Sequence, residues 1–364
     1  MDHTKIAAYQ KESLDMVLRK MMSQVLDACI VTDLSVIRWL TGFSGSSARL
    51  LVTPEKSWLF TDFRYQEQAA CEVAVAEMVI AADGFMAELG SGLYPLGENV
   101  ALQSDKVTWH EASRFIELLH GKQRVIPVDS FFDEFRMVKN GMELTKMRRA
   151  AEISEQVLER VLAMISPSVT ELDIAAEITW QHKKLGAERD SFEPIVAGGV
   201  RSAMPHARPS SAHFQPGELI VIDTGCVVEG YASDQTRTVA LGKISGEARE
   251  LYRIVQDAQE LGIASARCGM AAKDLDAVVR RYISDHGYTE EFGHGLGHGV
   301  GLNVHEEPRI SSKGEHELRE NMVFTIEPGI YLSGKFGVRI EDTVVMGPHG
   351  ATPLQQFTKE LIEL

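Results

Sequence analysis

The chain has 364 residues with 37 basic and 52 acidic side chains, so its formal net charge is −15. This charge disfavours nucleic acids and anionic membrane surfaces as partners, and the length favours two domains. The four cysteines form no CxxC pair, no apolar run could span a bilayer, and residues 1–20 lack a signal peptide's apolar core. We therefore expect a cytoplasmic protein.

The first part of the chain alternates helical and strand patterns, which predicts a small α/β domain. A turn at Thr41–Ser47 matches neither a phosphate-binding loop nor a serine nucleophile elbow, and we interpret it as structural. The pattern changes near Val138, so we expect a first domain over 1–137 and a second over 138–364. The elements expected in the first domain are a helix over 9–26 and strands over 28–31, 49–52 and 57–60.

The second part of the chain repeats one order of elements, helix, helix and hairpin, at an interval of about 105 residues. Two copies predict a pseudo-twofold domain with a central cleft rather than a solenoid. The elements expected in the first copy are helices over 141–165 and from the capping box Thr170–Asp173, and a hairpin over 218–241. Those expected in the second copy are a helix after Ser245, a helix over 273–286 and a hairpin over 322–346.

Each predicted hairpin carries two acids within apolar strands. If the first hairpin reverses after Val228, Asp223 lies directly opposite Asp234, and the equivalent reversal in the second hairpin pairs Glu327 with Glu341. A single strand acid is ordinarily exposed or paired with a base. Two facing pairs would repel and take up protons unless cations lay between them, so the hairpins favour a metal site.

A glycine-rich segment, 292–301, supplies the histidine that best matches these acids. Glycine at every other position leaves room for a bulky ligand near the backbone, and the spacing departs from that of a dinucleotide-binding loop. His298 is the best candidate for a nitrogen ligand beside the four carboxylates. Such a donor set suits a catalytic pair of Mn, Co, Fe or Zn ions, among which we favour manganese.

Two His-x-x-Pro segments occupy corresponding places in the repeat, at His206–Pro209 and His305–Pro308. They predict two histidines that flank one cleft. Imidazoles placed there could donate hydrogen bonds to a substrate carbonyl and to the charge that develops on it.

Taken in order, these motifs resemble the M24 metallopeptidase family, which includes creatinase, prolidase, aminopeptidase P and methionine aminopeptidase. The resemblance implies an α+β pita-bread catalytic domain preceded by a smaller α/β creatinase-like domain. It also implies two divalent metal ions on the five residues named above, with Asp234 and Glu341 bridging, and substrate contacts from His206, His294, His305 and Arg339. The segments that carry the resemblance are 41–45, 59–65, 221–225, 233–238, 294–306, 325–329 and 338–343.

The family resemblance also implies an activity, hydrolysis of the bond before a proline in the second position of a peptide. Metal-bound hydroxide would attack the carbonyl, Glu327 would transfer the proton to the leaving nitrogen, and His206 and His305 would stabilise the intermediate. Xaa-Pro aminopeptidase and Xaa-Pro dipeptidase both fit the motifs, and a homodimer is expected because family members often dimerise. The alternatives are a creatinase-like or other non-peptidase enzyme and a catalytically silent binding protein.

Overall fold

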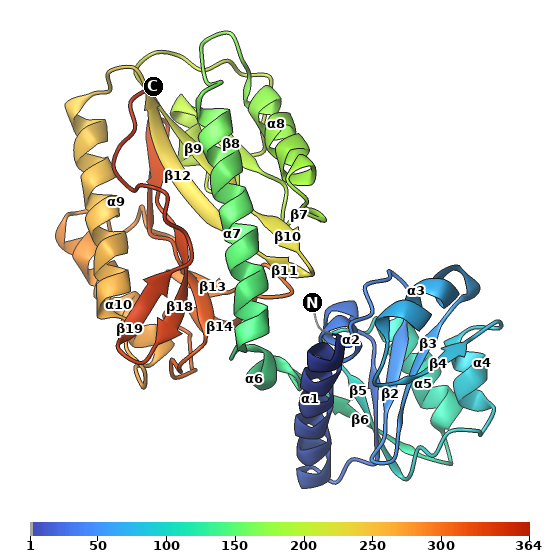
Figure 1. The fold of residues 1–364 in the computed structure, drawn as a ribbon. Helices are drawn as coiled ribbons and strands as arrows, with labels where there is room; N and C mark the ends of the chain where they lie inside the picture. Colours follow the sequence, from blue (N-terminus) through green and yellow to red (C-terminus); the bar gives the residue numbers. More distant parts are fainter. Residues whose placement is uncertain (1–2) are drawn as a thin grey trace. The chain divides into compact units, whose positions relative to one another are not determined.

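The computed structural model describes residues 3–364, with side chains from residue 6 onward, as two compact units (Figure 1). The first unit ends at Phe135, and the second spans Arg136–Leu364. Among the described residues, no helix combines the length and the apolar character needed to cross a membrane.

The first unit is built on a six-stranded sheet with the order β4-β3-β2-β1-β5-β6, in which only β2 runs antiparallel to its neighbours. The turn that begins at Thr41 is the end of a helix, because Gly42 has φ 82° and its N–H donates to the Arg38 carbonyl. The strands are β1 (Ala28–Val31), β2 (Arg49–Val52), β3 (Ser57–Thr61), β4 (Glu77–Ile80), β5 (Asn99–Gln103) and β6 (Arg124–Val128). The helices are α1 (His3–Ser23), α2 (Leu34–Thr41), η1 (Phe63–Tyr65), α3 (Gln66–Glu72), α4 (Phe85–Gly90) and α5 (Trp109–Leu119), with α6 (Asp133–Arg136) at the join between the units.

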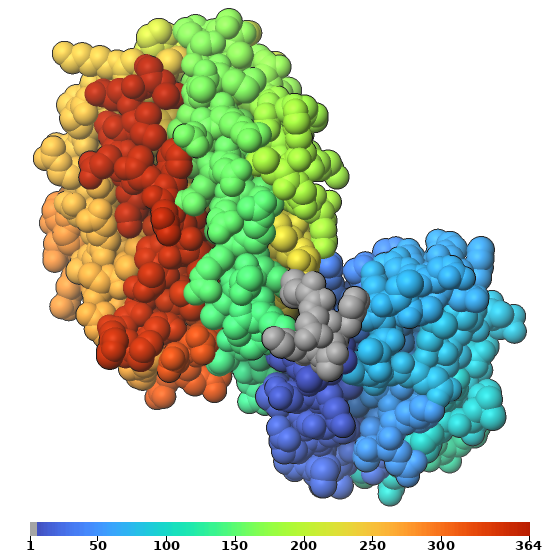
Figure 2. Space-filling view, viewed as in Figure 1, coloured from blue at the N-terminus to red at the C-terminus, as the bar shows by residue number. Residues whose placement is uncertain are grey.

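The second unit contains the predicted repeat of two helices followed by a hairpin. Helix starts follow local capping chemistry: the Thr170 side chain accepts a hydrogen bond from the Asp173 N–H, and Ser245 caps the third long helix in the same way. The helices are α7 (Gly141–Leu162), α8 (Glu171–Lys184), η2 (Gly199–Ala203), α9 (Gly246–Ser265) and α10 (Ala272–Asp285). Figure 2 shows α7 along one face of this unit, beside the C-terminal segment.

Three antiparallel sheets and one two-stranded ribbon carry the hairpins of the second unit. The sheets have the orders β11-β10-β7, β12-β9-β8 and β14-β13-β15-β18-β19, and β16 pairs with β17. The strands of the first half are β7 (Arg189–Asp190), β8 (Ile195–Gly198), β9 (Glu218–Thr224), β10 (Cys226–Val228), β11 (Tyr231–Ala232) and β12 (Gln235–Leu241). Those of the second half are β13 (Gly297–Gly299), β14 (Glu306–Ile310), β15 (Val323–Ile326), β16 (Gly329–Leu332), β17 (Phe336–Arg339), β18 (Asp342–Gly347) and β19 (Gly350–Pro353).

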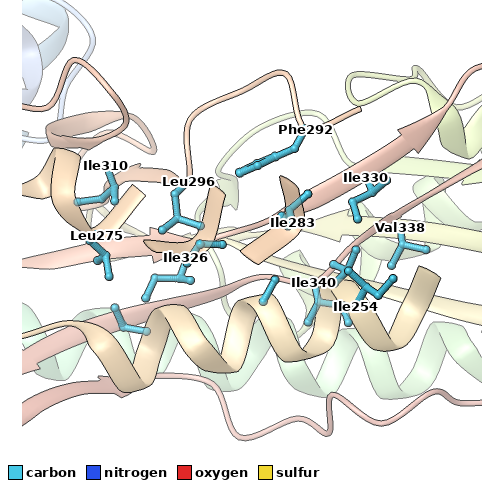
Figure 3. Close-up of a cluster of buried hydrophobic side chains, with 14 of the residues drawn as sticks. Ile254, Leu275, Ile283, Phe292, Leu296, Ile310, Ile326, Ile330, Val338 and Ile340 are labelled. Carbon is cyan, nitrogen blue, oxygen red and sulfur yellow. The ribbon is translucent and has the colours of Figure 1, made fainter. Parts of the chain in front are cut away.

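Each half of the second unit packs its helices on the outer face of its sheet. In the first half, Ile174 and Ile178 of α8 join Ile220 and Ile222 of β9 in one buried cluster. In the second half, side chains of α9, α10 and β15–β17 gather in another cluster (Figure 3). These apolar layers leave the opposite faces of the sheets to form the cleft.

The predicted register of the first hairpin is wrong. Its reversal uses Glu229 and Gly230, both with positive φ, so Val228 pairs with Tyr231 and Asp223 pairs with Thr236 rather than with Asp234. The error leaves both acids on one face, because side chains alternate and the register differs by two residues.

The predicted register of the second hairpin is confirmed. Ile326 pairs with Asp342, and Gly329 pairs with Arg339 around a reversal at Gly334. The two acids of this hairpin therefore lie next to each other in the short gap between the paired stretches.

Candidate active site

A cleft of about 470 Å³ in the second unit brings together every site residue that the sequence predicts. Strand ends supply the acids, and β13 supplies His298. The two His-x-x-Pro segments supply His206 and His305, and His294 lies shortly before β13. The predicted residues that line the cleft are His206, Asp223, Asp234, His294, His298, His305, Glu327, Arg339 and Glu341.

The tightest group in the cleft consists of Asp234, His298 and Glu341, whose potential ligand atoms all lie within 4.8 Å of one another. His298 Nε2 lies 3.6 Å from Asp234 Oδ2 and 3.4 Å from Glu327 Oε1. The Nδ1 atom of His298 is 3.1 Å from the carbonyl of Gly299, which can only accept, so Nδ1 carries the proton. The lone pair on Nε2 therefore faces the carboxylates, as a metal ligand requires.

Burial and mutual repulsion disfavour the ionised forms of the acids in the cluster. Burial raises the pKa of Asp234 and of Glu341 well above the usual range, and neighbouring carboxylates raise both further. Burial also raises the pKa of Glu327 and lowers that of His298. A cation between these groups would relieve the repulsion and favour ionised acids beside a neutral imidazole.

Arg339 is the positive group at the base of the cluster. Its guanidinium donates to Asp223 Oδ2 at 2.7 Å, to Thr236 Oγ1 at 2.9 Å and to the hydroxyl of Tyr331 at 2.9 Å. A further N–H donates to the carbonyl of Pro205 at 3.1 Å. These contacts hold Arg339 rigidly and leave one of its five N–H donors for other partners.

The sequence analysis missed Tyr331 and Thr236, which form hydrogen bonds with predicted site residues. Tyr331 lines the cleft and lies 3.2 Å from His294 Nε2, whose Nδ1 is 2.8 Å from the Gly295 carbonyl. That carbonyl requires the proton on Nδ1, so the tyrosine hydroxyl donates to Nε2. Thr236 donates to Glu341 Oε2 at 2.6 Å. The available signal was that Tyr331 follows Glu327 by four residues, an even spacing of the kind that puts side chains on one side of an extended segment.

The His-x-x-Pro histidines both face the cleft, as the repeat predicts. The ring of His305 packs edge-on against that of His298 at a centroid distance of 4.3 Å, and burial lowers the pKa of His305. A neutral imidazole keeps one N–H donor for a substrate oxygen. His206 lies on an exposed segment that follows η2.

The alternating glycines serve a different purpose from the one predicted. A Cβ on Gly297 would lie 2.0 Å from the Thr325 carbonyl oxygen, and one on Gly299 would lie 2.2 Å from that of Glu307. The space at these positions is therefore filled by neighbouring strands and not by a ligand. The glycines let β13 pack closely enough to bring His298 to the acids.

Comparison with known proteins identifies the family. The model of metallopeptidase family M24 matches residues 145–348, and that of the creatinase/prolidase N-terminal domain matches residues 14–138. The chain belongs to metallopeptidase family M24. This M24 chain is 35% identical over 356 residues to an Xaa-Pro dipeptidase of Pyrococcus horikoshii. The matched region covers 96% of this chain and 99% of the relative.

Solved structures are similar to this one over nearly the whole chain. A structure of Xaa-Pro dipeptidase from Bacillus anthracis has a TM-score of 0.94 at 32% identity, covering 98% of this chain and 100% of the other. A structure of X-Pro aminopeptidase from Thermotoga maritima has a TM-score of 0.87 at 36% identity, covering 95% and 100%. The predicted fold, a creatinase-like domain before a pita-bread catalytic domain, is confirmed, and the chain is a metallopeptidase.

Proposed function

We propose that this metallopeptidase hydrolyses the peptide bond before a proline in the second position of its substrate. The observation that carries the proposal is the cluster of four acids, three of them buried, and His298, set beside three further histidines in one cleft. Apolar side chains, including Phe192, Ile195 and Pro205, line the same cleft and suit a proline ring. The similarity to Xaa-Pro enzymes over nearly the whole chain supports the same substrate class.

The cluster fits a pair of divalent cations. Asp223 Oδ1 is buried without a hydrogen-bond partner among the described residues, as expected of an atom that ligates a cation. Oxygen donors with one imidazole suit Mn, Co, Zn or Fe, with manganese favoured. The residues that would hold the ions are Asp223, Asp234, His298, Glu327 and Glu341. When bound, the ions supply Lewis acidity to the substrate carbonyl and lower the pKa of the attacking water.

The protein's own groups would handle the proton and the developing charge. Glu327 takes the proton from the water and delivers it to the proline nitrogen, the leaving group of a tertiary amide. The N–H groups of His206 and His305 donate to the carbonyl oxygen as it gains negative charge. Arg339 orients Asp223, and Tyr331 fixes the ring of His294.

Turnover of three peptides by the metal-reconstituted enzyme tests the substrate class. We expect cleavage of Ala-Pro or Ala-Pro-Ala, and the ratio of the two rates separates a dipeptidase from an aminopeptidase. Cleavage of Met-Ala-Ser alone would overturn the proline assignment. Cleavage of none of the three, with metals bound, would favour a non-peptidase enzyme or a binding protein.

A single substitution tests the proton transfer. We expect Glu327→Gln to lower kcat by about 10²- to 10⁴-fold, the usual contribution of a general base. Metal content is measured on the same sample by elemental analysis. Normal turnover by a fully loaded variant would show that another group moves the proton.

A further inference from the structure

The segment that carries His206 is held by one buried carboxylate. Glu171, the first residue of α8, is 1% exposed and accepts hydrogen bonds from the N–H of Gly198 at 3.0 Å and of Ser210 at 2.9 Å. The Ser210 hydroxyl donates to it at 2.7 Å, and Arg201 Nε lies 3.0 and 2.9 Å from its two oxygens. One side chain thus joins both ends and the middle of residues 198–210.

His206 lies between two carbonyls that are held by guanidinium groups. Arg201, already paired with the buried carboxylate, also donates to the carbonyl of Arg208. Arg339 donates to the carbonyl of Pro205. The backbone on both sides of His206 is therefore fixed by side-chain hydrogen bonds.

Regular secondary structure does not perform this task. Residues 204–212 belong to no helix or strand, so no ladder of backbone hydrogen bonds sets their position. Hydrogen bonds to an ionised carboxylate are among the strong ones, and a buried acid that loses its partners is costly. Backbone hydrogen bonds hold the far end of the segment, where the N–H groups of Glu171 and Leu172 donate to the carbonyls of Ala212 and Ser210. The pair formed by Glu171 and Arg201 supplies the side-chain hydrogen bonds on both sides of His206.

In the second half, a buried acid and an arginine hold a different cleft histidine, His294, with both charged residues on α10. Asp276 of α10 is 1% exposed and pairs with Arg280 through two contacts of 2.9 Å. Arg280 donates to the carbonyls of Phe292 at 2.9 Å and His294 at 2.7 Å, and the N–H of Leu296 donates to Asp276 at 3.0 Å. Both halves therefore fasten a histidine segment with a buried acid on the second helix and an arginine.

We propose that Glu171, acting through Arg201, is a positioning residue that holds His206 on the wall of the cleft. Neither Glu171 nor Arg201 lines the cleft, so the effect of the pair reaches the reaction through the histidine. The proposal rests on the proposed function insofar as His206 contacts the substrate.

A double-mutant cycle tests the coupling. We expect Glu171→Gln to lower kcat by about 10- to 100-fold with a smaller effect on KM, because misplacing a catalytic group by about 1 Å can cost 10²-fold. In a His206→Ala background, E171Q should change kcat no further. Multiplication of the two effects would overturn the proposal.

Glu143 provides the matched control. It is also buried in the first turn of a long helix, where it accepts from the Asn140 N–H and from the Tyr231 hydroxyl at 2.8 Å, and it does not line the cleft. Glu143→Gln should leave kcat nearly unchanged, and any loss should multiply with that of H206A.

NMR spectra of protein with isotope-labelled histidine give a readout that needs no substrate. The imidazole signal of His206 is assigned by its absence from the spectrum of H206A. We expect E171Q to shift or broaden it and E143Q to leave it in place. If E171Q folds poorly, Arg201→Gln replaces it in the test, and we expect the same change in the signal. An unmoved signal in both variants would overturn the positioning role. Failure of the wild type to cleave Xaa-Pro peptides would instead refute the proposed function, and the spectra would still decide the positioning.

Discussion

The acidic cluster makes a quantitative prediction about the metal-free protein. Ligand oxygens of Asp234 and Glu341 lie within 4.8 Å of each other, and both side chains are buried. Two unit charges at that distance repel by about 3.5 kcal/mol at an effective dielectric constant of about 20. Burial and neighbouring acids raise the pKa of both groups, so the cluster can retain a proton, and the repulsion acts in full only where both acids are ionised.

Replacing Asp234 with Asn removes one of these charges at nearly constant shape. We therefore expect the metal-free variant to melt up to about 7–14 °C above the metal-free wild type at pH 8, since 1 kcal/mol corresponds to about 2–4 °C in a domain of this size. With excess Mn²⁺ the order should reverse, because ion binding at about 1,000 times Kd stabilises the native wild type by about 4.1 kcal/mol. The variant lacks a ligand and gains less.

The difference in stability between metal-free D234N and the metal-free wild type should depend on pH. The folded-state pKa of Asp234 lies above its unfolded value, so the folded wild type binds more protons between the two values. Its free energy of unfolding therefore falls as pH rises from the ordinary aspartate range, about pH 4, through the raised pKa. The difference between variant and wild type should be small near pH 4 and grow toward neutral pH.

Thermal melts in a chelator, from pH 4.5 to 8.5, measure this difference. Glu250→Gln, which removes an exposed charge on α9, is the control and should change the melting temperature little. A metal-free D234N protein that is no more stable than the wild type at pH 8 would refute the reasoning.

Two further predictions concern packing and thiol accessibility. Gly297→Ala should destabilise the protein by about 1–3 kcal/mol in chemical denaturation, because the added Cβ would meet the Thr325 carbonyl. Gly293→Ala should be nearly neutral, because no atom lies within 4 Å of the position of its Cβ. Equal effects of the two substitutions would contradict the packing explanation. A thiol reagent should modify Cys71 and Cys268 in the native protein, because both are exposed, and spare the two buried cysteines until unfolding; rapid modification of all four would contradict the buried placement.

Much of the fold was predictable because its signals are local. Thr170 and Ser245 mark helix starts, because their side chains accept hydrogen bonds from N–H groups in the first turn. The repeat of elements follows from apolar periodicity. The register of the second hairpin followed from a single glycine at its reversal. The residue types of the candidate site, acids and histidines at matching places in a repeat, also pointed to one cleft.

By itself, the sequence thus determined the order of elements, the gathering of the acids and the family motifs. Only the tertiary structure decided the first hairpin's register, because Glu229 adopts a positive φ that residue preferences disfavour. It also decided the purpose of the glycines at 297 and 299, since the atoms they accommodate belong to other strands. The contacts of Tyr331 and Glu171 join residues far apart in the chain. Such contacts cannot be predicted from apolar periodicity, because periodicity shows only which face of an element is buried.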